Sequence, residues 1–401
     1  MATLSRERGA WHQSEWCIVM YKFYEFFAGG GMVRAGLGSQ WSCVFANDFD
    51  HKKCATYSKN WGSDVIKPVN VKTLKTSDLP GTADLAWASF PCQDLSLAGG
   101  GAGLRGERSG TFWPFWSLMK SLVKEGRAPS IIVLENVCGA LTSHGGKDFS
   151  AICETFQQAD YQYGAMVIDA ALFVPQSRPR LFIIGVKGDV MIPDWLYSNE
   201  PIAHWHTRTI RTAFDNLQAK LKKSWMWWNP PIPPRRKIGL ADLIENEPAG
   251  VVWHTDIETR TLLSLMSDVN LAKVNAAKKV GKRIVGTIYK RTRRDENGVK
   301  AQRAEVRFDN VAGCLRTPAG GSSRQVILVV KGERVLSRLM SSRETARLMG
   351  LPDEYKLPEN YNEAYHLTGD GVVVPVVKHL AVNLFEPLLE YQNAISQTVA
   401  A

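Results

Sequence analysis

The chain has 401 residues, 45% of them hydrophobic and 22% charged, and this composition excludes a disordered or fibrous protein. At about 150 residues per domain, the length predicts two domains. Lys and Arg outnumber Asp and Glu by 49 to 39, and this excess of positive charge favours a polyanionic partner.

Residues 1–18 mix charged and polar side chains, and we expect them to form an N-terminal extension without an apolar secretory core. From residue 19 to residue 190, short apolar runs alternate with helical patterns, as in βαβ units. The expected strands cover residues 19–27, 43–47, 84–90, 131–135, 166–169 and 181–186. This alternation predicts an α/β domain with a mostly parallel sheet, whose ligands lie at the carboxyl ends of the strands.

The pattern changes after residue 190. Residues 191–330 carry 23 Lys and Arg against 13 Asp and Glu, so the rest of the chain has no net charge. We expect a smaller, irregular and basic domain over residues 191–333, with the tryptophans at 225, 227 and 228 in its core. From Arg334 the pattern becomes helical, and residues 334–401 are expected to return to the first domain, with a closing helix over residues 376–391.

A glycine-rich turn follows the first expected strand, at Gly29 to Gly31. Glycines there permit a tight turn and a close approach of the backbone to a ligand. Asp48 follows the second strand, where an acidic side chain can accept hydrogen bonds from ribose hydroxyls. An ordinary strand-to-helix turn and a helix N-cap explain the same residues equally well.

The third strand runs into Pro91 and then Cys92. Because proline cannot continue a central ladder, the strand stops there and presents Cys92 at the edge of the sheet. A cysteine in this position is a candidate nucleophile if its neighbours lower its pKa. The alternative is a buried structural cysteine, which is our interpretation of the other six.

Polar residues also end the next strand and precede the last one. Glu135 and Asn136 follow the apolar run from Ile131, which places Glu135 beside the Cys92 strand if the strand order is sequential. Arg178 and Arg180 are two residues apart in an extended segment, so their side chains point to the same side and can clamp oxygen acceptors. A helix N-cap and a solvated basic turn are the alternatives for these two segments.

Taken in order, these segments and two later ones resemble the cytosine-C5 DNA methyltransferase family. The matching segments are Phe27-Ala-Gly-Gly-Gly, Pro91-Cys92-Gln93, Glu135-Asn136-Val137, Gln176-x-Arg178-x-Arg180, Arg338 to Pro352 and Gly369-Asp370-Gly371-Val372. The resemblance implies a Rossmann-like methyltransferase domain that uses S-adenosylmethionine, with a target-recognition region inserted before the last two segments.

The resemblance also implies catalytic roles. The thiolate of Cys92 would attack C6 of a cytosine flipped out of the duplex. Glu135 would hold or protonate N3 of the base. Arg178 would contact the base O2, and Arg180 would support it.

For the cofactor, the resemblance implies aromatic, backbone and carboxylate contacts. Its expected residues are Phe27 and Phe49 beside the adenine, Gly29 and Gly31 beside the methionine part, Asp48 on the ribose, and Asn70, Val71, Asp370 and Val372 around them. Two of these depart from the family pattern, since Asn70 replaces a usual Asp and Asp370-Gly371 replaces a usual Asn-Ser. An amide oxygen can still accept the adenine hydrogen bond.

Base recognition is expected in the glycine-rich segment that starts at Leu315. Its candidate DNA contacts, with one residue beside the nucleophile, are Gln93, Arg316, Thr317, Ser322, Ser323 and Arg324. A solvated basic loop is the alternative.

The sequence therefore predicts a monomeric DNA (cytosine-5-)-methyltransferase of the bacterial or phage modification type that acts on double-stranded DNA. A cognate restriction endonuclease would be a partner and not a required subunit. The alternatives are a tRNA cytosine-C5 methyltransferase and a catalytically weak DNA-binding regulator. No run of about 18 apolar residues predicts a membrane span. Seven scattered cysteines without CxxC spacing favour a cytoplasmic location with neither disulfides nor a metal site.

Overall fold

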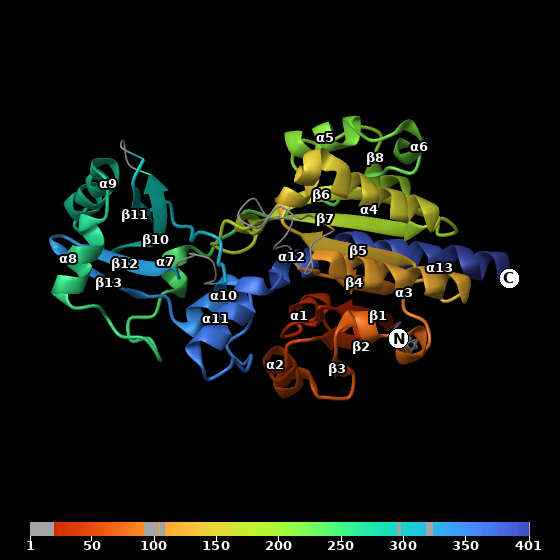
Figure 1. Cartoon of the computed structure of the whole chain (residues 1–401), viewed down its shortest axis with the longest axis horizontal. Helices are drawn as coiled ribbons and strands as arrows, with labels where there is room; N and C mark the ends of the chain where they lie inside the picture. The colour runs from red at the N-terminus through yellow and green to blue at the C-terminus, as the bar shows by residue number, and fades with distance from the viewer. Residues whose placement is uncertain (1–19, 92–103, 105–108, 295–297, 318–323, 401) are drawn as a thin grey trace, which may run out of the picture.

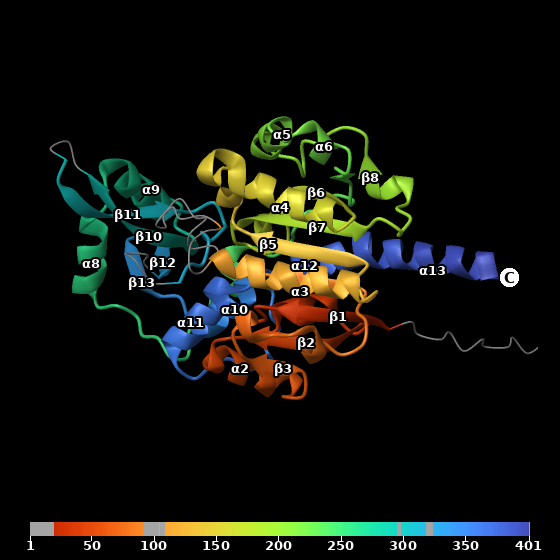
Figure 2. The same cartoon turned by 45° about the vertical axis from the view of Figure 1, so that its right-hand side comes forward.

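The computed structural model describes residues 20–91, 104, 109–294, 298–317 and 324–400. The predicted N-terminal extension, Cys92, Gln93, Ser322 and Ser323 lie outside these residues. Figures 1 and 2 show a larger part built around one sheet and a smaller part built around another.

The larger part contains a seven-stranded sheet in the order β3-β2-β1-β4-β5-β7-β6. Its strands are β1 (Tyr21–Phe26), β2 (Trp41–Asp48), β3 (Ile66–Pro68), β4 (Leu85–Ala88), β5 (Ile131–Asn136), β6 (Tyr161–Asp169) and β7 (Pro179–Lys187). Strands β1 to β5 are parallel, and only β7 runs antiparallel to its two neighbours, β5 and β6. The predicted α/β fold with a mostly parallel sheet is confirmed, and only the short β3 was not predicted.

Helices cover both faces of this sheet (Figure 1). Alternate strand residues such as Trp87 and Ala86 belong to different hydrophobic clusters, one on each face. One cluster includes α1 (Met32–Leu37), α2 (His51–Trp61), α12 (Val374–Leu380) and α13 (Glu386–Ala400). The other includes α3 (Phe112–Lys124) and α4 (Lys147–Gln158). The strands are therefore buried on both faces, which explains their continuous apolar runs.

The predicted closing helix is present as α12 and α13, joined by a π-helical turn at Ala381–Phe385. By length and hydropathy alone, the helical stretch Tyr361–Thr398 could cross a membrane, but 61% of its apolar window is buried inside the protein. Burial of that kind is typical of a core helix.

The smaller part is more regular than the sequence indicated. It contains an antiparallel sheet in the order β11-β10-β12-β13, made of β10 (Ile284–Arg294), β11 (Lys300–Arg307), β12 (Val326–Lys331) and β13 (Arg334–Leu339). Helices α8 (Asp256–Ser264) and α9 (Asp268–Lys279) pack on it. The helix expected from Arg334 is wrong over β13, because the turn at Gly332 brings this segment back to pair with β12. The predicted helix begins at Ser342 instead, as α10 (Ser342–Leu348).

The tryptophan cluster is buried, but not in the smaller part. Trp225 packs against Tyr163 of β6 and Phe149 of α4, with ring centroids 5.9 and 6.1 Å apart. Strand β9 (Trp227–Trp228) pairs with β8 (Tyr197–Ser198), and α5 (Arg208–Asp215) and α6 (Ala219–Lys222) lie nearby along the chain. The placement of these tryptophans in the core of the smaller domain is wrong, because Gly164 of β6 leaves room for the backbone of Met226 to approach the large sheet.

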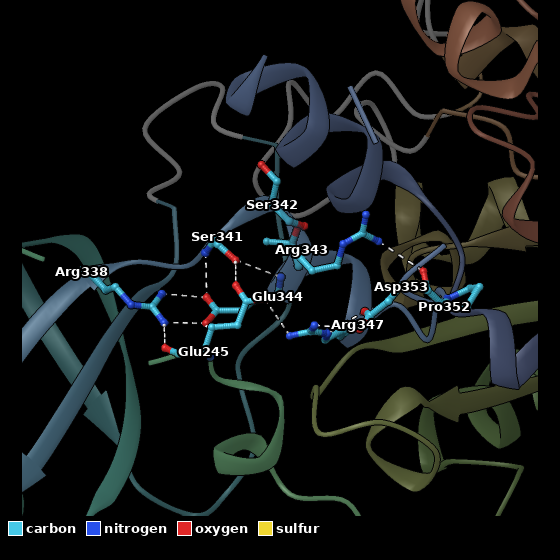
Figure 3. Close-up of polar contacts among 10 residues, drawn as sticks. Glu245, Arg338, Ser341, Ser342, Arg343, Glu344, Arg347, Pro352 and Asp353 are labelled. Carbon is cyan, nitrogen blue, oxygen red and sulfur yellow. Dashed lines mark hydrogen bonds and ion pairs between the residues drawn. The ribbon is translucent and has the colours of Figure 1, made fainter. Parts of the chain in front are cut away.

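A buried ion pair joins the two parts (Figure 3). Arg338 of β13 and Glu344 of α10 are both fully buried and make two hydrogen bonds of 2.8 and 2.6 Å. Arg338 also donates to the main-chain oxygen of Glu245, which lies just after α7 (Leu240–Leu243), over 2.7 Å. Arg347 then links the side chains of Glu245 and Asp353. Two chain connections between the parts therefore meet at one charged cluster.

Candidate active site

The ends of β4 and β5 meet at one edge of the sheet, as the sequence predicts. The two strands are parallel neighbours. Beyond β4, the carbonyl of Phe90 accepts a hydrogen bond of 3.1 Å from the side chain of Asn136 at the end of β5. Asn136 thus fixes the segment that leads through Pro91 to Cys92.

Glu135 lies at this edge with 6% of its surface exposed. Burial raises the pKa of its carboxyl above the ordinary value, and Arg180, Arg178 and the Ser89 hydroxyl oppose this only in part. The carboxyl therefore keeps its proton to a higher pH than an exposed glutamate would. A protonated carboxyl can donate a hydrogen bond to a ring nitrogen.

The reversed direction of β7 brings the two predicted arginines to the same edge. Because β7 is antiparallel to β5, its first residues lie beside the last residues of β5. Arg180 Nε lies 3.3 Å from Glu135 Oε1, and the two side chains are 17% and 8% exposed. The predicted carboxylate and one predicted arginine therefore form a pair.

Arg178 has different contacts, all with the protein. Its guanidinium donates to the carbonyl oxygens of Leu315, Gly369 and Gly371 over 2.8, 2.9 and 2.8 Å. It is 2% exposed. The neighbouring Gln176 holds the same segment, because its side-chain oxygen accepts a hydrogen bond of 3.0 Å from the Leu315 nitrogen. These contacts favour Arg180, and not Arg178, as the arginine that faces a substrate.

A second thiol lies between the two arginines. Cys314 Sγ is 3.2 Å from a guanidinium nitrogen of Arg178 and 3.9 Å from one of Arg180. Burial alone would raise the pKa of Cys314, but Arg178, Arg180 and Arg316 together lower it. The sequence grouped Cys314 with the structural cysteines, since no spacing rule links it to segments more than 130 positions away.

The contrast between the arginines predicts two different phenotypes. Arg178→Met should lower the free energy of unfolding by about 3 kcal/mol or more, because three carbonyls lose a charged donor. Arg180→Met should cost less stability, since burial already raises the pKa of Glu135 and its carboxyl can keep a proton when its partner is removed, yet the change should suppress methyl transfer. Urea unfolding and a methyl-transfer assay on both variants check this. Equal losses of stability would contradict the assignment.

The glycine turn after β1 provides an open backbone surface. Gly29 has φ of +54°, and a Cβ there would meet only open space. At Gly31, with φ of +79°, a Cβ would collide with Trp61, so only glycine fits. Phe27 is half-buried and also left-handed, at φ 57°. The turn therefore leaves its backbone accessible at Gly29, where the sequence predicts the cofactor.

The other predicted cofactor residues line the ends of β2 and β3. Asp48 accepts hydrogen bonds of 2.9 Å from the nitrogens of Gly29 and Asp50, and burial raises its pKa. Phe49 is 65% exposed, so its ring can offer a face to a flat ligand. Asn70 caps a helical turn by accepting from the Lys72 nitrogen, and Val71 behind it is buried.

The last motif contributes a charged bridge. Asp370 pairs with Lys53 of α2 over 2.7 Å and accepts a hydrogen bond of 2.7 Å from Thr317. Burial alone would raise the pKa of Asp370, but Lys53 and Thr317 lower it. Val372 is buried among the core residues. Asp370 and Thr317, predicted for cofactor and DNA respectively, thus bind each other.

These residues fit an adenosine-containing cofactor. Three features lie at adjoining strand ends: a glycine turn with an accessible backbone, a carboxylate that accepts from backbone nitrogens, and an exposed aromatic ring. Within the described part of the chain, no group of three or more His, Cys, Asp or Glu residues could hold a metal ion.

The predicted recognition residues are divided. Arg316 lines a cavity of about 440 Å³ together with Cys314, Tyr289 and Arg307. Arg324 instead bonds to Asn362 and lies over the ring of Tyr361, 5.7 Å from its centroid. The structure thus places Arg316 near the arginine pair and Arg324 against α11 (Tyr361–Asp370).

Comparison with known proteins places the chain in one family. The profile of the C-5 cytosine-specific DNA methylase family matches residues 21–386. Among curated relatives, the type II methyltransferase M.BsuFI of Bacillus subtilis is 25% identical over 92% of this chain and 73% of its own length. M.NgoBI of Neisseria gonorrhoeae is 26% identical over 90% of this chain and 91% of its own.

Solved structures resemble the fold. The methyltransferase EhMeth of Entamoeba histolytica has a TM-score of 0.60 at 14% identity, covering 92% of this chain and 99% of that one. The Dnmt2 methyltransferase of S. pombe has a TM-score of 0.54 at 16% identity, with the same coverage. At these identities the likeness concerns the fold alone.

Proposed function

This chain belongs to the C-5 cytosine-specific DNA methylase family, and from that membership we propose that it transfers a methyl group from S-adenosylmethionine to C5 of a cytosine in duplex DNA. The observation that carries the proposal is the pair of Glu135 and Arg180, 3.3 Å apart, beside the strand end that leads to Cys92. A carboxyl and a guanidinium at this spacing can hold two edges of one pyrimidine.

For the cofactor, we propose the strand ends described above. The Gly29 backbone would approach the methionine part, Asp48 would bind the ribose, and Phe27, Phe49, Asn70 and Val71 would surround the adenine. S-adenosylmethionine supplies an electrophilic methyl group when bound. Asp370 would act on this site through Lys53, with which it forms an ion pair of 2.7 Å.

The chemistry on the base follows from the nucleophile and the buried carboxyl. The thiolate of Cys92 would attack C6 of a flipped cytosine, while Glu135 donates a proton to N3, so that C5 becomes nucleophilic. After C5 is methylated, its proton would pass to solvent, elimination would return the Cys92 thiolate, and N3 would give its proton back to Glu135. Arg180 would contact O2, while Arg178 would hold Leu315 and the last motif in place.

We propose that the smaller part recognises the DNA sequence. Arg316 would lie between this part and the strand ends that carry Glu135 and Arg180. Since residues 197–228 pack on the large sheet, the recognition region would be shorter than the predicted 191–333. The names of the relatives favour a type II modification enzyme in the bacterial cytoplasm, with a cognate restriction endonuclease. We propose that the enzyme acts as a monomer.

Expression in cells that lack cytosine methylation tests the function. Bisulfite sequencing of the plasmid is expected to find 5-methylcytosine at one short motif, with an empty-vector culture as the control. Unmarked DNA together with methylated tRNA would sink the DNA assignment in favour of RNA. Absence of methylation on both would leave a DNA-binding protein.

A further inference from the structure

The end of α11 is packed between a segment proposed to meet DNA and a helix beside the proposed cofactor site (Figure 1). A Cβ at Gly369 would come within 3.1 Å of the Thr317 nitrogen, and a Cβ at Gly371 would collide with the sulfur of Met32 in α1. Only residues without a side chain allow both approaches. Residues 369–371, which we call the α11 end, therefore touch the DNA side with one glycine and the cofactor side with the other.

Asp370 lies between these two glycines and bonds in both directions. One of its carboxylate oxygens accepts a hydrogen bond of 2.7 Å from the Thr317 hydroxyl. The other oxygen lies 2.7 Å from the ammonium of Lys53 in α2. The Lys53 side chain is only 21% exposed, so its charge depends on acidic neighbours more than on water.

Lys53 has a second acidic neighbour, the proposed ribose ligand Asp48. Burial alone would lower the pKa of Lys53, but Asp370 and Asp48 raise it. Burial raises the pKa of Asp48, and Lys53 opposes this effect. Each oxygen of Asp48 already accepts one backbone hydrogen bond, from Gly29 or from Asp50, so each keeps one further lone pair for a ribose hydroxyl. An ammonium that moved from Asp370 to Asp48 would occupy these positions.

We propose that Asp370 couples the binding of DNA to the binding of the cofactor, by holding the Lys53 ammonium away from Asp48. DNA contacts at Arg316 and Thr317 would fix the Thr317 hydroxyl on Asp370, and Asp370 would then retain Lys53. Without DNA, the ammonium can pair with either carboxylate, and on Asp48 it competes with the ribose. The inference rests on the proposed function for both ligands, and it deepens that function by making their binding cooperative.

Two variants with opposite expected effects test the proposal. Lys53→Met removes the competing ammonium, so the cofactor affinity without DNA is expected to rise to the level found with DNA. Asp370→Asn keeps an oxygen that can accept from Thr317 but loses the charge that holds Lys53, so the cofactor affinity with DNA is expected to fall to the level found without it. Each change abolishes the difference that DNA makes, and a role in folding alone would not raise an affinity.

Lys52→Met is the matched control. Lys52 precedes Lys53 in α2 and also pairs with a carboxylate of α11, Glu363, over 2.7 Å. Its side chain is 71% exposed. The control thus loses the same charge and the same kind of contact between the two helices, and it is expected to keep the coupling of the wild type.

The measured quantity is the affinity for S-adenosylhomocysteine, the cofactor without its methyl group, by equilibrium dialysis. It is determined with and without a saturating short duplex that carries the motif methylated in the plasmid. DNA is expected to tighten binding by about 5-fold or more in the wild type and in Lys52→Met, and by less than about 2-fold in the other two variants. Thermal unfolding verifies that all four proteins fold.

Several results would overturn the proposal. They are a wild type whose cofactor affinity does not respond to DNA, a coupling that survives in Lys53→Met or Asp370→Asn, and a loss of coupling in Lys52→Met. If Asp370 only contacted the cofactor, Asp370→Asn would weaken binding by the same factor with and without DNA.

Failure of the proposed function gives a different result. If no DNA motif is methylated, or if the wild type does not bind S-adenosylhomocysteine, the proposed function fails and the coupling fails with it. If the wild type methylates DNA and binds both ligands but the variants keep the coupling, only the role given to Asp370 and Lys53 fails.

Discussion

Replacement of Glu135 by glutamine is expected to lower the rate of methyl transfer by about 10² to 10⁴-fold, the usual contribution of a general acid. Glutamine preserves the size of the side chain and an oxygen that can accept from Arg180, but it has no acidic proton. The measurement is single-turnover methyl transfer with saturating DNA. Because burial already raises the pKa of Glu135, a neutral amide should leave the stability nearly unchanged.

A Cys92→Ala variant gives the background rate of this assay, since it removes the proposed nucleophile. The Glu135→Gln protein should fall between this background rate and the wild type, and its cofactor affinity should be unaltered. A rate for Glu135→Gln within about 10-fold of the wild type would argue that the carboxyl only positions the base.

Loss of Glu344 is expected to have the largest effect on stability. In the Glu344→Ala variant, Arg338 remains fully buried without its counter-charge, and such a change costs about 3–5 kcal/mol. The ring of Trp253 lies 4.8 Å from the Arg338 guanidinium carbon, so tryptophan fluorescence during urea unfolding can follow the loss.

Arg347→Ala is the matched control, because it removes ion pairs of the same cluster that are about one quarter exposed on the arginine side. We expect it to cost under about 1 kcal/mol. The paired variant Arg338→Met with Glu344→Met should be more stable than Glu344→Ala, since it leaves no unpaired buried charge. A Glu344→Ala protein as stable as the Arg347→Ala protein would refute the role given to this ion pair.

The meeting of the ends of β4 and β5 could be predicted because it follows from local pattern and sheet geometry. Apolar runs located β4 and β5, and parallel neighbours place their carboxyl ends together, which is how the end of β5 comes to lie beside Phe90, the strand end that precedes Cys92. The two-residue spacing of Arg178 and Arg180 correctly predicted that both point to one side.

The different contacts of Arg178 and Arg180 could not be predicted. It depends on which guanidinium meets the backbone of Leu315, Gly369 and Gly371, and these partners lie far along the chain. The strand conformation of β13 also depends on long-range pairing. Its residues carry no strong local signal for a helix or a strand, and it forms a strand because it pairs with β12. For the same reason, no local pattern revealed Cys314 between the arginines or Lys53 beside Asp370.

The cluster of Arg338, Glu344 and Glu245 has a consequence for exchanging specificity between relatives. If the proposed recognition role of the smaller part holds, a transplanted region would enter after α7 and leave through β13, so both splice points would fall within this cluster. Cuts placed between Arg338 and Glu344 would join a buried cation from one parent to an unrelated helix start from the other. Chimaeras that take the whole segment from before Glu245 to beyond Arg347 from one parent keep these charges matched. This segment is therefore the unit to exchange between relatives.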